Sequence, residues 1–237
     1  KIGLTFHAAD NVDISATVQR GYRAGGLDTV GNATGVVTTA APYDAEFSTN
    51  YELALRSHWF DSQLFVNANV FYVDYEDQQV GIITPVANAP GQSLIQTVNA
   101  GESHSYGAEL ELVYRPKAIT GLQLYANIGL LQTEFDEFST PTSNFAGNDF
   151  RSSPDVNVNA GVSYFHHSGI FGSLEGSYQS EAFTGVSNNF ENDSRIIVDA
   201  KLGYRYNDKY SVYVYGSNIF DEEYFTNSDS LNGSVEV

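Results

Sequence analysis

Two short stretches combine residue types that can catalyse a reaction or bind a metal ion. They consist of Glu102, Ser103, His104 and Ser105 in the first stretch, and of His166 and His167 in the second. Adjacent residues of a strand point to opposite faces of a sheet, so a neighbouring Ser and His cannot act together as nucleophile and base. The adjacent histidines lie in a predicted short turn that supplies none of the further ligands a zinc site needs. We therefore predict no catalytic residue and no metal site.

The motifs of common enzyme classes are missing from the sequence. It contains no G-x-S-x-G nucleophile elbow, no glycine-rich phosphate loop and no H-E-x-x-H zinc motif. Cysteine is absent, which excludes disulfides and thiol chemistry. The formal net charge of −18 has the wrong sign for nucleic-acid binding, because phosphate contacts need Lys and Arg. We predict a protein that is not an enzyme, needs no cofactor and has no nucleic-acid partner.

Apolar and polar residues alternate along most of the chain. The apolar positions of five such segments are Val12, Ile14, Ala16 and Val18; Ala108, Leu110, Leu112 and Tyr114; Leu122, Leu124, Ala126, Ile128 and Leu130; Val156, Val158, Ala160 and Val162; and Ile196, Val198, Ala200, Leu202 and Tyr204. A period of two predicts strands with one apolar and one polar face, although residues 64–75 carry apolar residues on both faces. No run approaches the roughly 18 to 20 apolar residues of a membrane helix, so any membrane crossing must use strands.

Short and long connections alternate between these segments. The short ones are residues 10–11, 61–62, 117–121, 167–169 and 207–208, and the long polar ones are residues 25–42, 84–92, 139–153, 185–193 and those after 226. This asymmetry is typical of outer-membrane barrels, whose periplasmic turns are short and whose extracellular loops are long. Counting segments between turns predicts ten strands. The tenth runs to about Phe225, and its partner is absent or only begins at residues 235–237.

Aromatic residues gather toward both ends of the predicted strands. Near the short turns lie Trp59, Phe60, Tyr114, Tyr164, Phe165, Phe171, Tyr204, Tyr206 and Tyr210, and toward the long loops lie Tyr22, Tyr43, Phe47, Tyr72, Tyr75, Tyr106, Phe135, Phe138, Tyr178, Phe183, Tyr224 and Phe225. Two such bands are expected at the two interfaces of a membrane. We therefore predict an all-β protein, an antiparallel transmembrane β-barrel in contact with the lipid of a bacterial outer membrane.

Several segments resemble the carboxy-terminal half of the TonB-dependent outer-membrane receptors. The clearest are Asn218-Ile219-Phe220-Asp221-Glu222-Glu223-Tyr224, similar to the family's Asn-Leu-Phe-Asp-x-x-Tyr near the penultimate strand, and Arg20-Gly21-Tyr22-Arg23, similar to its Arg-Gly-Phe-Arg where a strand enters an outer loop. Segments within residues 51–79 and 99–111 follow in the family's order. The resemblance spans residues 1–226.

This resemblance implies a barrel of about twenty-two strands, with an amino-terminal plug inside it and a periplasmic TonB partner that drives import. The plug, its TonB-contacting segment, the first half of the barrel and the final strand have no counterpart here. We expect residues 1–237 to be a partial barrel, one part of a longer polypeptide. Unpaired sheet edges leave backbone groups unsatisfied in lipid at several kcal/mol each, so the chain is not expected to insert stably alone.

Ligand recognition is expected in the long loops, because a rigid barrel presents them to the outside. The candidates, which join aromatic surfaces to a few charges, are Arg23, Tyr43, Phe145, Asp149, Arg151, Phe183 and Phe190. On the polar face, the charged residues expected in the barrel interior are Glu109, Glu111, Asp199, Lys201 and Arg205. These line a substrate path, hold the plug by ion pairs, or are simply solvated.

The resemblance implies plug-gated uptake of one solute, energised by TonB. A ferric siderophore or similar metal chelate is expected, because siderophores are the most frequent substrates of the resembled family. A passive porin-like channel and a soluble β-rich binding or adhesion module are the alternatives. A plug upstream of residue 1 would distinguish the receptor from the channel, and a monodisperse chain without detergent would indicate the soluble module. The residues present do not name the solute.

Overall fold

A computed structural model describes residues 1–31, 37–85, 93–207 and 209–225 of the chain. All of the regular secondary structure within these ranges is β-strand. No helix in the described part of the chain is long and apolar enough to span a membrane. The prediction of an all-β fold is confirmed.

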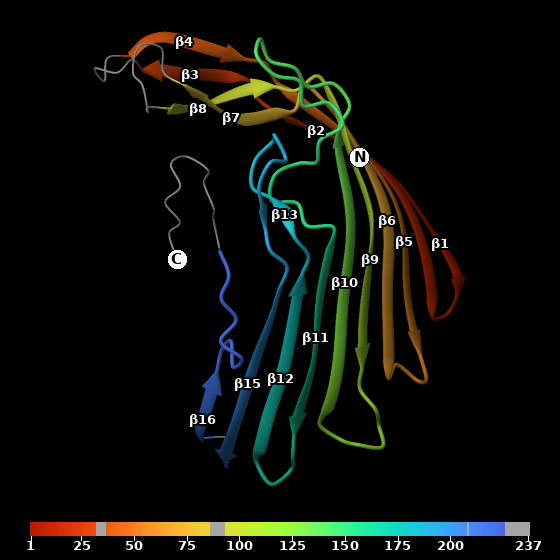
Figure 1. Ribbon diagram of the computed structural model, residues 1–237. Helices are drawn as coiled ribbons and strands as arrows, with labels where there is room; N and C mark the ends of the chain where they lie inside the picture. The colour runs from red at the N-terminus through yellow and green to blue at the C-terminus, as the bar shows by residue number, and fades with distance from the viewer. Residues whose placement is uncertain (32–36, 86–92, 208, 226–237) are drawn as a thin grey trace.

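Ten strands form one antiparallel sheet, curved like part of a cylinder wall, with β1 and β16 as its edges (Figure 1). In sheet order they are β1 (Ile2–Ala9), β2 (Val12–Arg23), β5 (Glu46–Trp59), β6 (Leu64–Glu76), β9 (Glu102–Tyr114), β10 (Leu122–Phe135), β11 (Val156–Phe165), β12 (Ile170–Gln179), β15 (Arg195–Tyr206) and β16 (Tyr210–Gly216). Each strand pairs with the one before it in this order. The predicted ten-strand meander is therefore confirmed, and its barrel is open among the described residues.

Short turns lie at one end of the sheet and long connections at the other (Figure 1). The long connections contain hairpins that the sequence did not predict, and these extend beyond the predicted loops of residues 84–92 and 185–193. They are β3 (Gly26–Gly31) with β4 (Val37–Tyr43), β7 (Gln79–Pro85) with β8 (Ser93–Asn99), and β13 (Ala182–Phe183) with β14 (Glu191–Asn192). The hairpin β3–β4 contacts β8 at the loop end. The further strand predicted to begin at residues 235–237 lies outside the described residues.

The tenth strand is shorter than predicted, because β16 ends at Gly216 and a turn follows it. Asn218 and Asp221 have φ angles of 48° and 56°, in the left-handed region that strands do not use. The Asn218 side chain stabilises this turn by accepting a hydrogen bond from Glu222 N and donating one to Glu222 O, both at 2.9 Å. The prediction of a strand to about Phe225 was wrong because it followed apolar residues through this turn.

The two faces of the sheet differ in polarity. Ala16, Leu53, Val70 and Ala108 form one cross-strand row on the aliphatic face, and the Leu53 and Val70 side chains are about half exposed. The pairing also settles residues 64–75, where Val66, Ala68, Val70 and Tyr72 join the aliphatic face. The aliphatic face has no protein partner in the described chain, which suits contact with lipid.

The predicted aromatic bands are divided between the two faces. Tyr51, Tyr72 and Tyr106 form a row on the aliphatic face near the long loops, where an interfacial girdle is expected. Other predicted girdle residues lie on the polar face, namely Tyr75, Phe135, Phe165 and Phe171. Sequence distance from a turn predicts the depth of an aromatic ring, whereas strand pairing decides its face.

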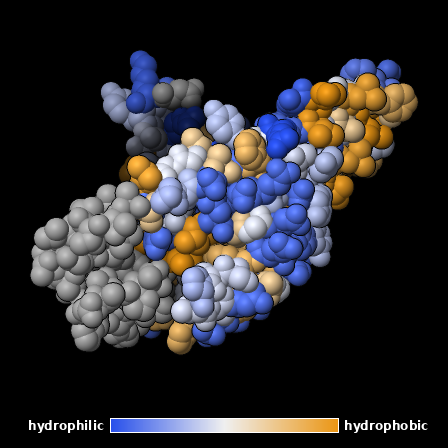
Figure 2. All heavy atoms as spheres, turned by 90° about the horizontal axis from the view of Figure 1, so that it is seen from above, coloured by the Kyte–Doolittle hydropathy of each residue, from blue (hydrophilic) through white to orange (hydrophobic). Residues whose placement is uncertain are grey.

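The most deeply buried side chains lie at the loop end of the sheet. This loop core consists of Val80, Ala100, Phe135, Phe138 and Val186, with Ile82, Val98, Phe145 and Phe150 packed against it. The rings of Phe135 and Phe150 are 4.7 Å apart, and Phe138 lies 5.0 Å from Phe145. Seen from above the loops, hydrophilic residues cover most of the described surface over this end (Figure 2). The loop core therefore fastens three long connections to the barrel wall.

Gly107 on β9 allows a close approach between neighbouring strands. A Cβ atom at this position would lie 2.7 Å from the Phe71 ring and would also meet the Leu130 carbonyl oxygen. Gly107→Ala should therefore reduce the free energy of unfolding by about 1–3 kcal/mol, the range for overpacking. Urea unfolding of the protein in lipid vesicles measures this. Gly176→Ala is the matched control, because a Cβ there meets nothing within 4 Å, and equal losses in both variants would contradict the prediction.

Candidate functional site

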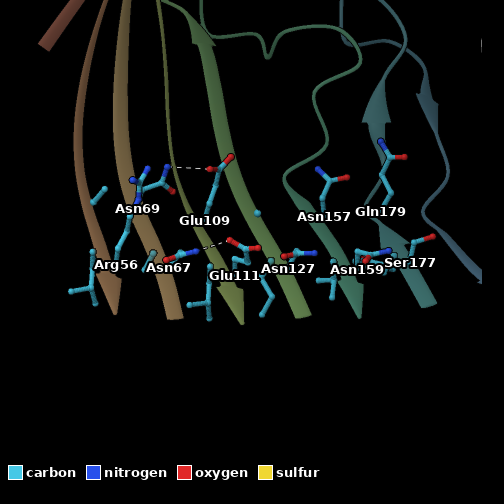
Figure 3. Close-up of a pocket in the computed structure, with 18 of the residues that line it drawn as sticks. Arg56, Asn67, Asn69, Glu109, Glu111, Asn127, Asn157, Asn159, Ser177 and Gln179 are labelled. Carbon is cyan, nitrogen blue, oxygen red and sulfur yellow. Dashed lines mark hydrogen bonds between the residues drawn. The ribbon is translucent and has the colours of Figure 1, made fainter. Parts of the chain in front are cut away.

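A polar hollow of about 600 Å³ lies on the concave face of the sheet. Its lining is rich in amide side chains from neighbouring strands, namely Asn67, Asn69, Asn127, Asn157, Asn159 and Gln179 (Figure 3). Strand pairing aligns Asn67, Glu111, Asn127 and Asn159 in one row that crosses four strands. The amides lie at alternate positions of their strands, and this spacing is the sequence signal that could have identified them as a group.

The acidic residues predicted for the barrel interior have hydrogen-bond partners on the adjacent strands. Asn67 Nδ2 donates to Glu111 Oε2 at 2.8 Å, and Asn69 Nδ2 donates to Glu109 Oε2 at 3.1 Å (Figure 3). Amide donors therefore hold both carboxylates in position without neutralising their charge. The arrangement gives the concave face fixed hydrogen-bonding groups and net negative charge.

Asp199, also predicted to face the interior, anchors the turn that follows β16. Its Oδ1 atom accepts hydrogen bonds from Ser217 Oγ and from Asn218 N, both at 2.8 Å. The Tyr224 ring lies 4.7 Å beneath the Arg195 guanidinium, so the end of the segment packs on β15 as well. Of the residues that carry the resemblance, Asn218 and Tyr224 make these structural contacts, Asp221 supplies the second left-handed residue, and Phe220 is exposed.

The segment Arg20 to Arg23 forms the loop end of β2. Arg20 lies on the aliphatic face, 3.2 Å from Glu76 Oε2, with its guanidinium 5.0 Å from the Phe47 ring centroid. Gly21 faces Ser48, whose hydroxyl oxygen would be 3.0 Å from a Cβ at residue 21, and the exposed Tyr22 ring lies 6.4 Å from Phe47. The motif therefore packs against β5 and β6 at the loop end of β2, where the chain leaves the sheet.

Hydrogen bonds join the connection at residues 136–155 to the one at residues 180–194. Asn188 Oδ1 accepts from Asp149 N at 2.7 Å, and Asn188 Nδ2 donates to Asp149 O at 3.1 Å. Ser152 N donates to Phe183 O at 2.8 Å, and Asn148 Nδ2 donates to Val186 O at 2.8 Å. We call this set of contacts the loop clasp. Nothing in the sequence pattern singles out Asn188, which has a φ of 50°.

A second set of contacts joins the bases of the hairpins β3–β4 and β7–β8. Gln79 Nε2 donates to the carbonyl oxygens of Ala24 and Asp44, at 2.9 and 3.0 Å. Asn99 receives a hydrogen bond from Asp44 N at 2.8 Å and donates to Asp77 O at 2.7 Å. Farther out, Thr97 N donates to the Asp28 carboxylate. The side-chain amides of Gln79 and Asn99 hold the hairpin bases together, and we call these two residues the amide clamps.

The predicted ligand-binding residues occupy different environments within the loops. Phe145 packs against the loop core, and Asp149 lies in the loop clasp. Arg151 is exposed, and the Phe190 side chain is 64% exposed. Arg23 is exposed at the end of β2, while Phe183 and Tyr43 are half-buried, with the Tyr43 ring beside Gly26. The structure brings Asp149, Arg151 and Phe183 into one body of loops and places Arg23 and Tyr43 at the base of β3–β4.

The environment of Asp149 favours its protonated form. Partial burial raises the pKa of its carboxyl above the usual value near 3.8, and the negative charges of Asp155 and Glu134 raise it further. Because its pKa is raised, the Asp149 carboxyl binds a proton more readily when the loop clasp is formed than when the clasp contacts are broken. Its ionisation therefore destabilises the clasp as the pH rises through that raised pKa.

Asp149→Asn should stabilise the loop clasp at neutral pH and flatten its dependence on pH. The substitution leaves the backbone contacts to Asn188 in place and removes the unfavourable charge. Hydrogen exchange at the Ser152 and Asp149 amides, corrected for intrinsic rates, should slow in the variant at pH 7. Protection that falls in the variant would contradict the assignment. Glu137→Gln, a change in the same connection, is the control.

Asp199→Ala should destabilise the end of the sheet, because Ser217 Oγ and Asn218 N lose their acceptor. We expect a loss of about 1–3 kcal/mol, the cost of an unsatisfied partner of a charged group. Urea unfolding in vesicles is the measurement. Ser217→Ala, which removes one of the two bonds, should cost less, and an Asp199→Ala variant as stable as the parent would refute the anchoring role.

The sequence and the fold were compared with known proteins. Residues 1–219 match the family described as TonB dependent receptor-like, beta-barrel. The structure is similar to the ferric yersiniabactin uptake receptor FyuA from Yersinia pestis, with 22% identity and a TM-score of 0.78, covering 98% of this chain and 33% of that chain. The siderophore receptor PiuA from Acinetobacter baumannii is 19% identical with a TM-score of 0.71, and the match covers 95% of this chain and 32% of that chain. The copper transporter OprC is 14% identical with a TM-score of 0.73, and the match covers 99% of this chain and 35% of that chain.

The chain spans about a third of the length of these similar proteins. At these identities the likeness to solved structures shows a shared fold, while the family match covers most of the chain. The resemblance read from Arg20–Arg23 and Asn218–Tyr224 and the predicted outer-membrane location are both confirmed. The family consists of receptors and transporters, not enzymes. This chain belongs to the TonB-dependent receptor-like β-barrel family of the bacterial outer membrane.

Proposed function

We propose that the chain forms the carboxy-terminal barrel part of a plug-gated receptor that imports one specific solute with energy supplied through TonB. The family match over residues 1–219 is the observation that carries this proposal. By name, FyuA is a ferric yersiniabactin uptake receptor, PiuA is a siderophore receptor and OprC is a copper transporter. These names support a metal chelate as the solute, with a ferric siderophore as the first candidate.

We further propose that strands of the same polypeptide, outside residues 1–237, complete the barrel. The backbone of β1 and β16 has donors and acceptors along one side with no partner among the described residues. In lipid each such group costs several kcal/mol, so these edges need further strands. The plug, by the same proposal, fills the concave side and contacts TonB.

The concave face suits a hydrated path or a docking surface for the plug. Amides fix the carboxylates of Glu109 and Glu111 at the wall. A moving solute or plug segment can exchange hydrogen bonds with such rows in successive steps, because neighbouring strands repeat similar groups. The face therefore favours polar cargo over an apolar molecule.

Recognition is assigned to the loops joined by the clasp. The exposed Phe190 ring and the exposed Arg151 guanidinium offer an apolar surface and a positive charge, which suit an anionic chelate with aromatic groups. Arg23 and Tyr43, at the base of β3–β4, are a separate pair of candidates for the same role. Phe145 and Phe183 support it by packing and backbone contacts.

Uptake of radiolabelled iron by cells that depend on this protein should test the proposal. Expression of the complete gene should restore uptake of one ferric chelate from a panel of catecholate, hydroxamate and mixed-ligand siderophores. Loss of TonB or collapse of the proton gradient should abolish uptake. Transport that persists without TonB would indicate the passive channel, and transport of copper chelates alone would overturn the assignment to iron.

Arg151→Ala and Phe190→Ala should each weaken chelate binding by roughly five- to thirtyfold, the effect of losing a central contact. Equilibrium binding to the purified receptor, followed by quenching of intrinsic fluorescence, measures this. Thr142→Ala, at another exposed position of the same loops, should leave affinity unchanged. Equal affinity in all three variants would place recognition elsewhere.

A further inference from the structure

An apolar groove of about 820 Å³ crosses the aliphatic face of the sheet in its short-turn half. Its floor is a row of small residues on three neighbouring strands, namely Ala126, Ala160 and Gly176. Leu112 and Val198 stand at the two ends of the same row. A Cβ at Gly176 would meet nothing within 4 Å, so open space lies above the floor. The groove is therefore a local depression in the wall that faces lipid.

Larger side chains border the groove toward the short turns. Leu124, Val162 and Leu174 form the next cross-strand row on that side. Beyond them the groove is lined by Tyr114, which pairs with Leu124, and by Phe60 in the turn between β5 and β6. Aromatic rings near the ends of membrane strands lie at the depth of the lipid head groups. The groove therefore extends from head-group depth into the hydrocarbon layer.

The turn that carries Phe60 has an unusual backbone conformation. Phe60, Asp61 and Ser62 have φ angles of 56°, 53° and 62°, in the left-handed region that residues other than glycine adopt at a cost. Gln63 holds the turn, because its N donates to Trp59 O at 3.0 Å and its Nε2 donates to Phe60 O at 2.8 Å. Strained backbone of this kind is often found where the direction of a side chain serves a function. Here the turn places Phe60 at the groove and Asp61 beside the neighbouring turn.

Two opposite charges lie beside this end of the groove. Lys117 Nζ is 3.4 Å from Asp61 Oδ2, and the two side chains are 62% and 89% exposed. Gln63 joins the same two turns, because its Oε1 accepts from Lys117 N and its O accepts from Arg115 N, both at 2.7 Å. An exposed ion pair contributes little stability, so each charge can exchange its partner for a ligand. A head group with one phosphate and one ammonium group would complement the pair, with the phosphate at Lys117 and the ammonium at Asp61.

We propose that the groove binds an acyl chain of one phospholipid of the periplasmic leaflet, whose zwitterionic, ethanolamine-type head group lies at Asp61 and Lys117. The floor and walls are apolar and face lipid, which suits a hydrocarbon chain. A flexible chain can follow a depression three strands wide, whereas the convex wall of a second barrel would pass over it. The charge pair favours this head group over an anionic one, because a head group without an ammonium leaves Asp61 without a partner.

Photolabelling of the complete receptor in vesicles tests the groove, and its outcome does not depend on the imported solute. The vesicles contain phosphatidylethanolamine and phosphatidylglycerol, with a trace of phosphatidylethanolamine that carries a diazirine in one acyl chain. Mass spectrometry should find the label concentrated on β10, β11 and β12 rather than on β2. Ala160→Leu with Gly176→Leu fills the groove and should lower this labelling by roughly three- to tenfold. Ala16→Leu, on the same face of β2, is the matched control and should leave it unchanged.

Competition between unlabelled lipids tests the head group. Phosphatidylethanolamine should displace the probe roughly two- to fivefold better than phosphatidylglycerol, and Asp61→Asn with Lys117→Gln should remove this preference. Lys209→Gln, which removes a cation near another short turn, should preserve it. Heat-modifiability on gels confirms that each variant still folds. Label spread evenly over the aliphatic face, labelling indifferent to the two leucines, equal competition by both lipids in the parent, or disulfide-linked dimers of an Ala160→Cys variant in the membrane would overturn the proposal.

Discussion

The ten strands of the main sheet depend on backbone hydrogen bonding in a solvent that offers none. Inside a bilayer an amide or carbonyl can be satisfied only by the adjacent strand, so the chain runs back and forth with each long strand pairing with its predecessor. That pairing also fixes which side chains face lipid and which face the interior, since a shift of one residue would exchange the two. The same strand register therefore produces both the aliphatic rows on one face and the amide rows on the other.

The interior wall is built by compensation between large and small side chains. Phe71 lies over Gly107, Tyr125 lies against Gly161, and Phe171 covers Gly203. Each ring shields a stretch of backbone that a glycine would otherwise expose, and the strands can approach closely. The remaining interior space is left to amides and carboxylates. The interior wall therefore combines aromatic rings packed on glycines with polar side chains that line the hollow.

The sequence predicted the elements governed by periodicity and turn length. Alternation identified five segments as strands, and counting the segments between turns gave the ten strands of the sheet. It did not predict where β16 ends, because the turn depends on one asparagine side chain closing on Glu222. It also did not predict that Phe145 packs in the loop core or that Asn188 joins two loops. Those contacts link residues far apart in the chain, and local patterning carries no information about them.

The amide clamps bear on how such a receptor can change over evolutionary time. Gln79 and Asn99 belong to the hairpin β7–β8. The carbonyl groups of Ala24 and Asp44, to which Gln79 donates hydrogen bonds, flank the hairpin β3–β4. A recombination event that exchanged only β3–β4 or only β7–β8 would leave these amides without matching backbone positions. The hairpins β3–β4 and β7–β8 are therefore expected to be exchanged together. New outer surfaces would arise by replacing both hairpins or by changing residues at their tips.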